Sequence, residues 1–139
     1  MQMDEAIAAQ LMDIFNNDPG FARTTGVRLI DIDLGTARGK VEIGPQHMNP
    51  IGSVQGGVIF TLADLVAGAA AFTYGSCHTT VSSDLHFLSP ALHTKTLFAQ
   101  ATTIKHGKRI VVLDVRVTDE RDTLLSSMTM TFYNLDIPL

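Results

Sequence analysis

The chain has 139 residues, 45% of them hydrophobic, which is enough for one domain to bury a core without disulfide or metal support. We therefore expect a single domain over residues 1–139. A net charge of −4 without a basic cluster argues against nucleic-acid binding.

Redox and targeting signals are few. The single cysteine, Cys77, cannot form an intrachain disulfide. The first residues, Met-Gln-Met-Asp-Glu-Ala, are acidic and do not resemble a basic leader before an apolar run. A cytoplasmic protein is therefore expected.

Residues 4–15 predict a short amphipathic helix. Ile7, Leu11 and Ile14 fall on one face, and the run Asn-Asn-Asp-Pro-Gly at residues 16–20 ends the helix. Such a helix commonly covers one end of a sheet. The alternative is a lid over a binding cleft.

A hairpin comes next. Residues 27–34 and 37–43 alternate polar and apolar side chains and predict two strands joined by a tight turn at residues 35–36. Gly-Pro at residues 44–45 ends the hairpin. A loop follows, in which His47 is expected to be an ordinary loop residue, with a ligand or base role as the weaker alternative.

From Val58 to Tyr74 the sequence is apolar nearly all round, which is typical of a helix surrounded by other parts of the protein. Asp64 is its only charge. A buried carboxylate is costly unless it finds a proton or hydrogen-bond donors, so Asp64 needs an explanation. One explanation is structural: Asp64 caps a neighbouring loop or pairs with an arginine. A membrane span is excluded because the run is too short and has the charge at its centre.

The third explanation is a catalytic carboxylate, and the pair Gly56-Gly57 favours it. Glycines at a helix start let a substrate approach the free backbone N–H groups, and the helix dipole there favours a developing oxyanion. Gly56 and Gly57 are therefore both expected to contact substrate.

Four further strands are predicted after Gly75, because polar and apolar residues alternate in each. Leu97, Ala99 and Ala101 share one face, and its small side chains would let a helix lie close. Short turns join the strands, so the sheet is antiparallel, and a curved sheet wrapped round one helix buries a helix this apolar. The fold class is therefore α+β. The four strands cover residues 79–88, 96–106, 109–118 and 123–134.

Three stretches carry a resemblance to a known family. Residues 49–57, Asn-Pro-Ile-Gly-Ser-Val-Gln-Gly-Gly, followed by Leu-Ala-Asp at residues 62–64, resemble the signature of hotdog-fold acyl-CoA thioesterases of the PaaI-like group, in the 4-hydroxybenzoyl-CoA thioesterase superfamily. Residues 80–91 resemble that family's third strand and its Pro-Ala exit, and residues 106–109 resemble its hairpin. The resemblance implies the hotdog fold, an acyl-CoA substrate, no cofactor, and a homodimer that pairs into a dimer of dimers, with active sites at the dimer interface.

The chain departs from the family pattern at three positions. Gln55 stands where the family usually has His, and Ser82 and Ser89 replace residues that are often Asp and Arg. Gln55 can donate a hydrogen bond as His does but cannot titrate, so any step that needs proton exchange at that position is lost.

Gly56 and Asp64 are eight residues apart, which is about 12 Å along a helix. A reacting thioester needs its oxyanion donors and its attacking group within about 3 Å, so one helix cannot supply both. Two copies of the helix that run antiparallel across a two-fold axis bring Gly56 of one chain to Asp64 of the other and create two equal sites.

In such a site the Gly56 N–H polarises the thioester oxygen, and the Asn49 side chain assists or orients. Asp64 activates water as a general base or attacks the thioester to form a mixed anhydride. Thr80 holds the water or has only a strand role. Three cations near the hairpin at residues 106–109 either bind the phosphates of coenzyme A or form a solvated turn. They are Lys105, Lys108 and Arg109.

Hydrolysis of a small or aromatic acyl-CoA thioester is the leading hypothesis. The alternative is a non-catalytic acyl-CoA binding or sensing module, which the glutamine at position 55 keeps open. A hotdog dehydratase or hydratase ranks last, because no histidine lies next to the glycine pair. The histidines show no zinc spacing, so no metal site is expected.

Overall fold

The computed structural model describes residues 3–139, so the first two residues of the acidic amino terminus lie outside the described part of the chain. The helices are α1 (Glu5–Asn16), α2 (Phe21–Thr25) and α3 (Gly56–Phe72), and a 3-10 turn, η1, covers Pro45–His47. The strands are β1 (Arg28–Asp33), β2 (Thr36–Glu42), β3 (Ser76–Phe87), β4 (Thr96–His106), β5 (Ile110–Asp119) and β6 (Leu124–Pro138).

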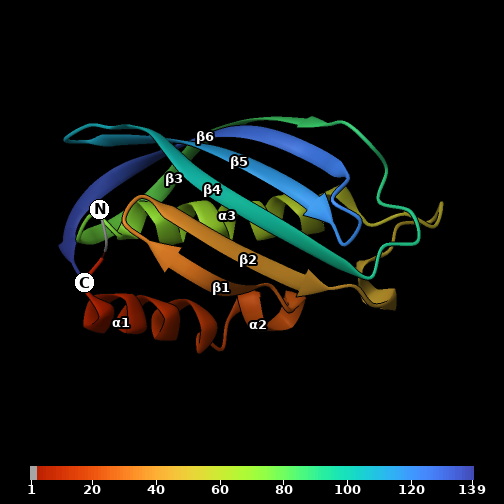
Figure 1. Cartoon of the computed structure of the whole chain (residues 1–139), viewed down its shortest axis with the longest axis horizontal. Coiled ribbons are helices and arrows are strands. Elements are labelled where there is room, and N and C mark those ends of the chain that lie inside the picture. Colours follow the sequence, from red (N-terminus) through yellow and green to blue (C-terminus); the bar gives the residue numbers. More distant parts are fainter. Residues whose placement is uncertain (1–2) are drawn as a thin grey trace.

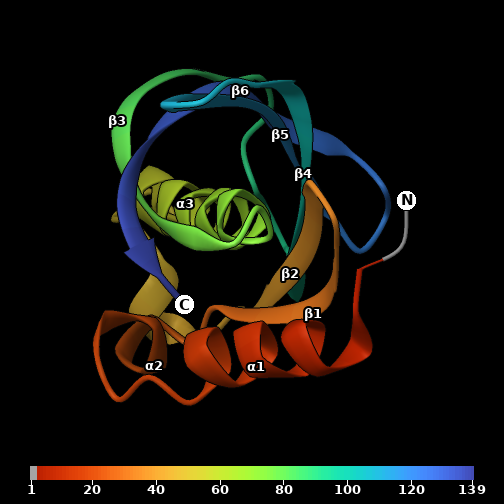
Figure 2. The same cartoon turned by 90° about the vertical axis from the view of Figure 1, so that its left-hand side faces the viewer.

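The six strands form one antiparallel sheet with the order β1-β2-β4-β5-β6-β3. The sheet curves round α3, which lies along its concave side (Figure 1). In an end-on view the strands arch over α3 from β3 to β1, and α1 and α2 lie beneath the β1 end (Figure 2). This is the α+β arrangement expected from the sequence, with one long helix inside a curved sheet.

Small residues let α3 lie close to the sheet. Ala67 of α3 and Ala101 of β4 are fully buried, as the small-residue face of the fourth strand predicted. Gly39 on β2 leaves no room for a side chain, because an added Cβ would lie 2.5 Å from Val66 Cγ2 and 2.7 Å from the Arg28 carbonyl oxygen. The Val66 side chain of α3 therefore lies directly against the backbone of β2 at this point.

Helix α1 covers the side of the fold next to β1, which is the covering role expected for residues 4–15. Leu11 of this helix is fully buried against the rest of the fold. The Asn16 side chain donates from Nδ2 to the Leu29 carbonyl oxygen (3.0 Å) and accepts from the Leu29 N–H at Oδ1 (2.8 Å). The ring of Phe15 meets that of Phe72 edge to face, with centroids 5.0 Å apart. These contacts tie α1 to both β1 and α3.

Strand β3 lies at one edge of the sheet and pairs only with β6. Its pairing with β6 shifts between Thr80 and Ser82, which leaves Val81 as a bulge. Val81 is 57% exposed and Phe87 is 55% exposed. A long edge strand with exposed apolar side chains is a surface on which another strand can pair.

His47 differs from the ordinary loop residue that was expected. It is buried, its Nδ1 accepts from the Gly44 N–H (2.9 Å), and its Nε2 lies 2.7 Å from the Thr25 carbonyl oxygen, to which it donates. Both ring nitrogens are therefore used to hold the loop before α3 against α2, and the alternative of a ligand or base is not supported.

Other differences from the expected elements are small. Helix α2 and the η1 turn were not predicted, β3 begins before residue 79, and β6 continues past residue 134. None of the helices in the described range combines the length and apolar character needed to cross a bilayer.

The close approach at Gly39 generates a stability prediction. Gly39→Ala should lower the free energy of unfolding by about 1–3 kcal/mol, because the new methyl overlaps Val66 and a backbone carbonyl. Urea unfolding followed by circular dichroism measures it. Gly68→Ala is the matched control: its Cβ would meet Phe132 at 3.5 Å, an ordinary contact, and alanine suits a helix interior better than glycine. Equal stabilities for Gly39→Ala and the parent would contradict the packing argument.

Candidate active site

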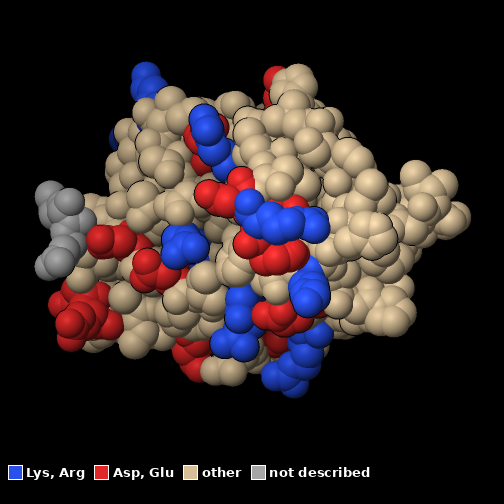
Figure 3. Space-filling model, turned by 45° about the vertical axis from the view of Figure 1, so that its right-hand side comes forward, with Lys and Arg blue, Asp and Glu red and all other residues tan. Residues whose placement is uncertain are grey.

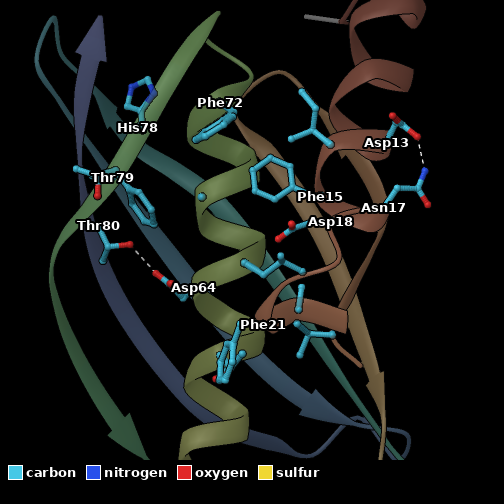
Figure 4. A pocket seen from close by; sticks show the side chains of 17 residues that line it. Asp13, Phe15, Asn17, Asp18, Phe21, Asp64, Phe72, His78, Thr79 and Thr80 are labelled. Atoms are coloured by element: carbon cyan, nitrogen blue, oxygen red, sulfur yellow. Dashed lines mark hydrogen bonds between the residues drawn. The ribbon is translucent and has the colours of Figure 1, made fainter. Parts of the chain in front are cut away.

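Asp64 and Thr80 are brought together across the gap between α3 and β3. The Thr80 hydroxyl donates to Asp64 Oδ1 at 2.6 Å (Figure 4). Within residues 3–139 no ion pair involves Asp64, so the structural explanation that it pairs with an arginine is not supported. Asp64 is partly exposed and keeps its second carboxylate oxygen free of protein donors. The carboxylate is therefore oriented by one hydroxyl and remains accessible.

A cavity of about 630 Å³ opens beside this pair. It lies between α3, β3 and the two N-terminal helices, and Figure 4 shows the side chains around it. Asp64 and Thr80 form part of its polar wall, and His78 on β3 is also in that wall. The apolar wall consists largely of Phe15, Leu65, Phe72 and Phe132. A cavity that is mostly apolar with a few converging polar groups is typical of a small-molecule site.

The two glycines lie at the start of α3. Gln55 is the N-cap residue, but its side chain makes no capping hydrogen bond. The first N–H groups of a helix have no acceptor within the helix, so those of Gly56 and Gly57 are available to a ligand. A Cβ at Gly57 would find only Gln55 Cγ, at 4.0 Å, whereas a Cβ at Gly56 would lie 3.0 Å from Phe87 Cζ. The amino end of α3 is therefore open and only lightly covered by Phe87.

A second cavity, of about 360 Å³, lies at this end of α3. Gly56 and Phe87 line it together with the loop after β3, residues 88–91. The loop is held from the β5–β6 turn, where Arg121 Nη2 donates to the Leu92 carbonyl oxygen at 3.0 Å. Burial acts to raise the pKa of Asp119 in that turn, but hydrogen bonds from the Thr123 N–H and from Arg121 outweigh it and lower the pKa.

The oxyanion side and the carboxylate side are separated within one chain. Gly56 and Asp64 both lie on α3, so the rise of the helix puts about 12 Å between them. Each faces its own cavity, and the two cavities share no lining residue. A single chain therefore does not bring Gly56 and Asp64 to one reacting carbonyl.

Asn49 has a local role in the loop before α3. Its Nδ2 donates to Ser53 Oγ (2.7 Å), and its Oδ1 accepts from the N–H groups of Ile51 (3.1 Å) and Ser53 (3.0 Å). The side chain is thus committed to shaping the loop that leads to Gly56. One of the two Nδ2 hydrogens is used in this way, so the arrangement agrees with an orienting role, and direct assistance to the oxyanion stays a prediction.

The three expected phosphate ligands lie at the other end of the helix. Lys105, Lys108 and Arg109 are exposed around the β4–β5 turn. The neighbouring His106 stacks on Tyr74, just after α3, with ring centroids 3.6 Å apart, and the Arg109 guanidinium bonds to Asp136. Helix α3 has 17 residues and rises roughly 24 Å from Gly56 to its last residue, which is the end nearer to these cations.

The surface around the start of α3 is instead apolar. Met48, Ile51, Leu88 and Leu92 are exposed there. On the face seen in Figure 3, Lys, Arg, Asp and Glu gather over the middle of the molecule, and the end on the right is free of them. An uncharged surface of this kind is suited to contact with another protein surface or an apolar ligand.

Comparison with known proteins identifies the family. The family model of the Thioesterase superfamily matches residues 51–126, more than half of the chain. Acyl-coenzyme A thioesterase PaaI of Escherichia coli (strain K12) is 28% identical over 108 residues, which are 78% of this chain and 76% of the relative.

Solved structures agree on the fold. The E. coli PaaI protein from the phenylacetic acid degradation operon superposes with a TM-score of 0.88 at 23% identity, over 94% of this chain and 95% of that chain. A Streptococcus mutans UA159 protein bound to acetyl-CoA has a TM-score of 0.77 at 23% identity, over 81% and 91% of the two chains. The expected hotdog fold and the expected enzyme class, a thioester hydrolase, are confirmed. The chain belongs to the Thioesterase superfamily.

Proposed function

We propose that the protein hydrolyses acyl-CoA thioesters that carry a small or aromatic acyl group. One observation carries the proposal: Asp64 is oriented by Thr80, has no cationic partner in the described chain, and faces a mostly apolar cavity. Support for the coenzyme A part comes from relatives, one named an acyl-coenzyme A thioesterase and one solved with acetyl-CoA.

The acyl group is assigned to the cavity between α3, β3 and α1. Its volume of about 630 Å³ is within the usual range of small-ligand pockets, and its aromatic walls suit an apolar or aromatic group. The carbonyl carbon then lies at the polar wall, beside Asp64. The free carboxylate oxygen faces the position from which water or the carboxylate itself attacks.

The oxyanion donor is assigned to a second copy of the chain. The separation of Gly56 from Asp64 and the open edge of β3 support a two-fold dimer in which β3 strands pair and α3 helices run antiparallel. Gly56 of one protomer then meets Asp64 of its partner. Further pairing of two dimers, which the family resemblance implies, stays a prediction.

The reaction follows from these positions. The Gly56 N–H of one protomer donates to the carbonyl oxygen as it becomes an oxyanion. On the base route, Asp64 takes a proton from water, the hydroxide oxygen bonds to the carbonyl carbon, the C–S bond breaks, and the proton passes to the leaving thiolate. On the nucleophile route, Asp64 bonds to the carbonyl carbon and the C–S bond breaks, which releases the thiolate and leaves a mixed anhydride. Water then cleaves the anhydride to free acid and the Asp64 carboxylate, and the proton released from the water passes to the thiolate. Thr80 holds Asp64 in position on either route.

Gln55 fits this scheme as a neutral residue. It lies exposed at the N-cap of α3, next to the assigned oxyanion donor. An amide can donate a hydrogen bond to substrate but cannot exchange a proton. The proton transfers are therefore assigned to Asp64 alone.

Asp64→Asn should reduce turnover of a preferred acyl-CoA by at least about a hundredfold, because an amide is neither base nor nucleophile. Thiol release measures turnover, and circular dichroism checks the fold. Asp31→Asn, at an exposed carboxylate on β1 at the opposite edge of the sheet, is the control and should keep parental turnover. Parental turnover in Asp64→Asn would remove this carboxylate from the mechanism.

Mixing two inactive variants tests the shared site. Gly56→Pro removes the N–H donor at the first position of α3, which tolerates proline, and Gln55 (φ −59°, ψ 134°) already has the extended backbone that precedes one. Refolding Gly56→Pro with Asp64→Asn at equal ratio should restore up to about a quarter of parental activity, because half of the dimers are mixed and each has one intact site.

Gly56→Ala is the control for that experiment, since it adds the same Cβ beside Phe87 but keeps the N–H. It should retain much more activity than Gly56→Pro. A mixture that is shown to have exchanged chains and still has only the mean activity of the two variants would place the whole site in one chain.

Replacing Lys108 and Arg109 together by Ala should raise KM more than it lowers kcat, because phosphate contacts far from the carbonyl contribute mainly uniform binding. The effect should shrink at high salt. Arg116→Ala, which removes one cation paired with Asp114 on another part of the sheet, is the control. Unchanged KM in the double variant would identify the β4–β5 turn as a solvated turn.

A further inference from the structure

The His47 side chain anchors the loop between β2 and α3 to the body of the fold. It is only 3% exposed, its Nδ1 accepts from the Gly44 N–H (2.9 Å), and its Nε2 donates to the Thr25 carbonyl oxygen (2.7 Å). Within residues 45–54 of the described chain, no other side chain forms a hydrogen bond to a different helix or strand. The side-chain bonds that Asn49 makes stay inside the loop.

The main chain of His47 reaches the amino end of α3. Its carbonyl oxygen accepts from the Gln55 N–H at 2.8 Å, and Gln55 is the residue directly before Gly56. The Gln55 side chain makes no capping bond, so no side chain caps the start of the helix. A backbone bond from the Val54 N–H to the Ala91 carbonyl oxygen (3.1 Å) also joins the loop to the rest of the fold. The direction of the Gly56 N–H therefore depends on where His47 is held.

The Thr25 carbonyl at the other end of this link belongs to the last residue of α2. The last carbonyl groups of a helix have no partner within the helix, so the imidazole N–H satisfies one of them. Phe21 and Ala22 of the same helix line the larger cavity. His47 thus joins a wall of that cavity to the end of α3 that presents Gly56.

We propose that His47 is a positioning residue, which fixes the direction of the Gly56 N–H through the backbone bond to Gln55. The proposal rests on the proposed function for the role of Gly56 as oxyanion donor. Such a donor is effective only when it is held in place before the charge develops, and its contact strengthens in the transition state. Loss of the anchoring bond should therefore lower kcat far more than it changes KM.

Two substitutions separate the two hydrogen bonds of the ring. Asn offers an acceptor near the Nδ1 position for the Gly44 N–H, but its side chain is too short to reach Thr25. Gln is one carbon longer and carries both an acceptor and a donor. With the better of benzoyl-CoA and acetyl-CoA as substrate, His47→Asn should lower kcat about ten- to a hundredfold and keep KM within about threefold. His47→Gln should recover most of kcat.

Circular dichroism checks that each variant is folded. His47→Leu, which removes both bonds but fills the buried space, takes the place of His47→Asn if the latter does not fold. His93→Asn is the matched control, because it changes an exposed histidine whose positive φ (53°) suits asparagine, and it should keep parental kcat.

Mixed dimers show whether the effect acts through Gly56. When Gly56→Pro is refolded with Asp64→Asn, the one intact site takes its N–H from the Asp64→Asn chain. Adding His47→Asn to that chain should lower the restored activity by the same factor as in the homodimer. Adding it to the Gly56→Pro chain, which has no N–H at this position, should lower the activity much less. A loss of stability alone would lower both alike.

The possible results separate this inference from the proposed function. Parental kcat in His47→Asn and His47→Leu, a loss confined to KM, or an equal loss from either chain of the mixed dimer would overturn the role of His47 while hydrolysis stands. If the mixture without a His47 change restores no activity, the shared site fails, and a kcat loss that His47→Gln reverses still supports the inference for a site within one chain. If the parent hydrolyses neither substrate, both fall.

Discussion

The close contact between α3 and the concave side of the sheet is the constraint on which the other features depend. A helix that touches the backbone of β2 through Gly39 cannot slide or rotate without overlap. Its one charged residue is therefore held at a fixed depth, on the strip of helix that the sheet leaves uncovered. That strip lies between the edge strand β3 and the N-terminal helices, where the larger cavity forms. Packing that serves stability thus also determines where Asp64 meets the larger cavity.

Asp64 breaks the apolar pattern of its helix, and among residues 3–139 it has neither the cationic partner nor the several hydrogen-bond donors that a structural charge would need. Its one protein hydrogen bond comes from a neutral hydroxyl, so much of the hydrogen-bonding capacity of the carboxylate is left for substrate and solvent. Local violations of this kind concentrate at functional sites. The same helix offers an uncapped amino end more than two turns away. Neither feature stabilises a single chain, and the proposed reaction uses both.

Local patterns in the sequence were enough to predict the helices, strands and turns that alternate clearly. Asp64 and Thr80 were both predicted as site residues, but the hydrogen bond between them was not predicted. Strand order was not predictable in this way, because it depends on pairings between residues far apart in the chain. The burial of His47 was missed for the same reason: its partner Thr25 is 22 residues away. The hydrogen bonds of Asn49 within its own loop agree with the orienting role, and its direct assistance to the oxyanion stays a prediction. His78 was not among the predicted site residues, because only the folded chain brings it into the wall of the larger cavity.

The contact between Asn16 and Leu29 also limits how the protein can assemble. The Asn16 amide imitates a strand neighbour, since it bonds to both the N–H and the carbonyl oxygen of Leu29 on the outer side of β1. The chain's own first helix thereby occupies this edge of the sheet at Leu29, whereas β3 has no strand on its outer side among residues 3–139. A sheet with a single open edge can be extended once, by a copy in the reverse orientation, and then has none left. Growth into a fibre through sheet edges is therefore blocked, and edge pairing is self-terminating at two chains.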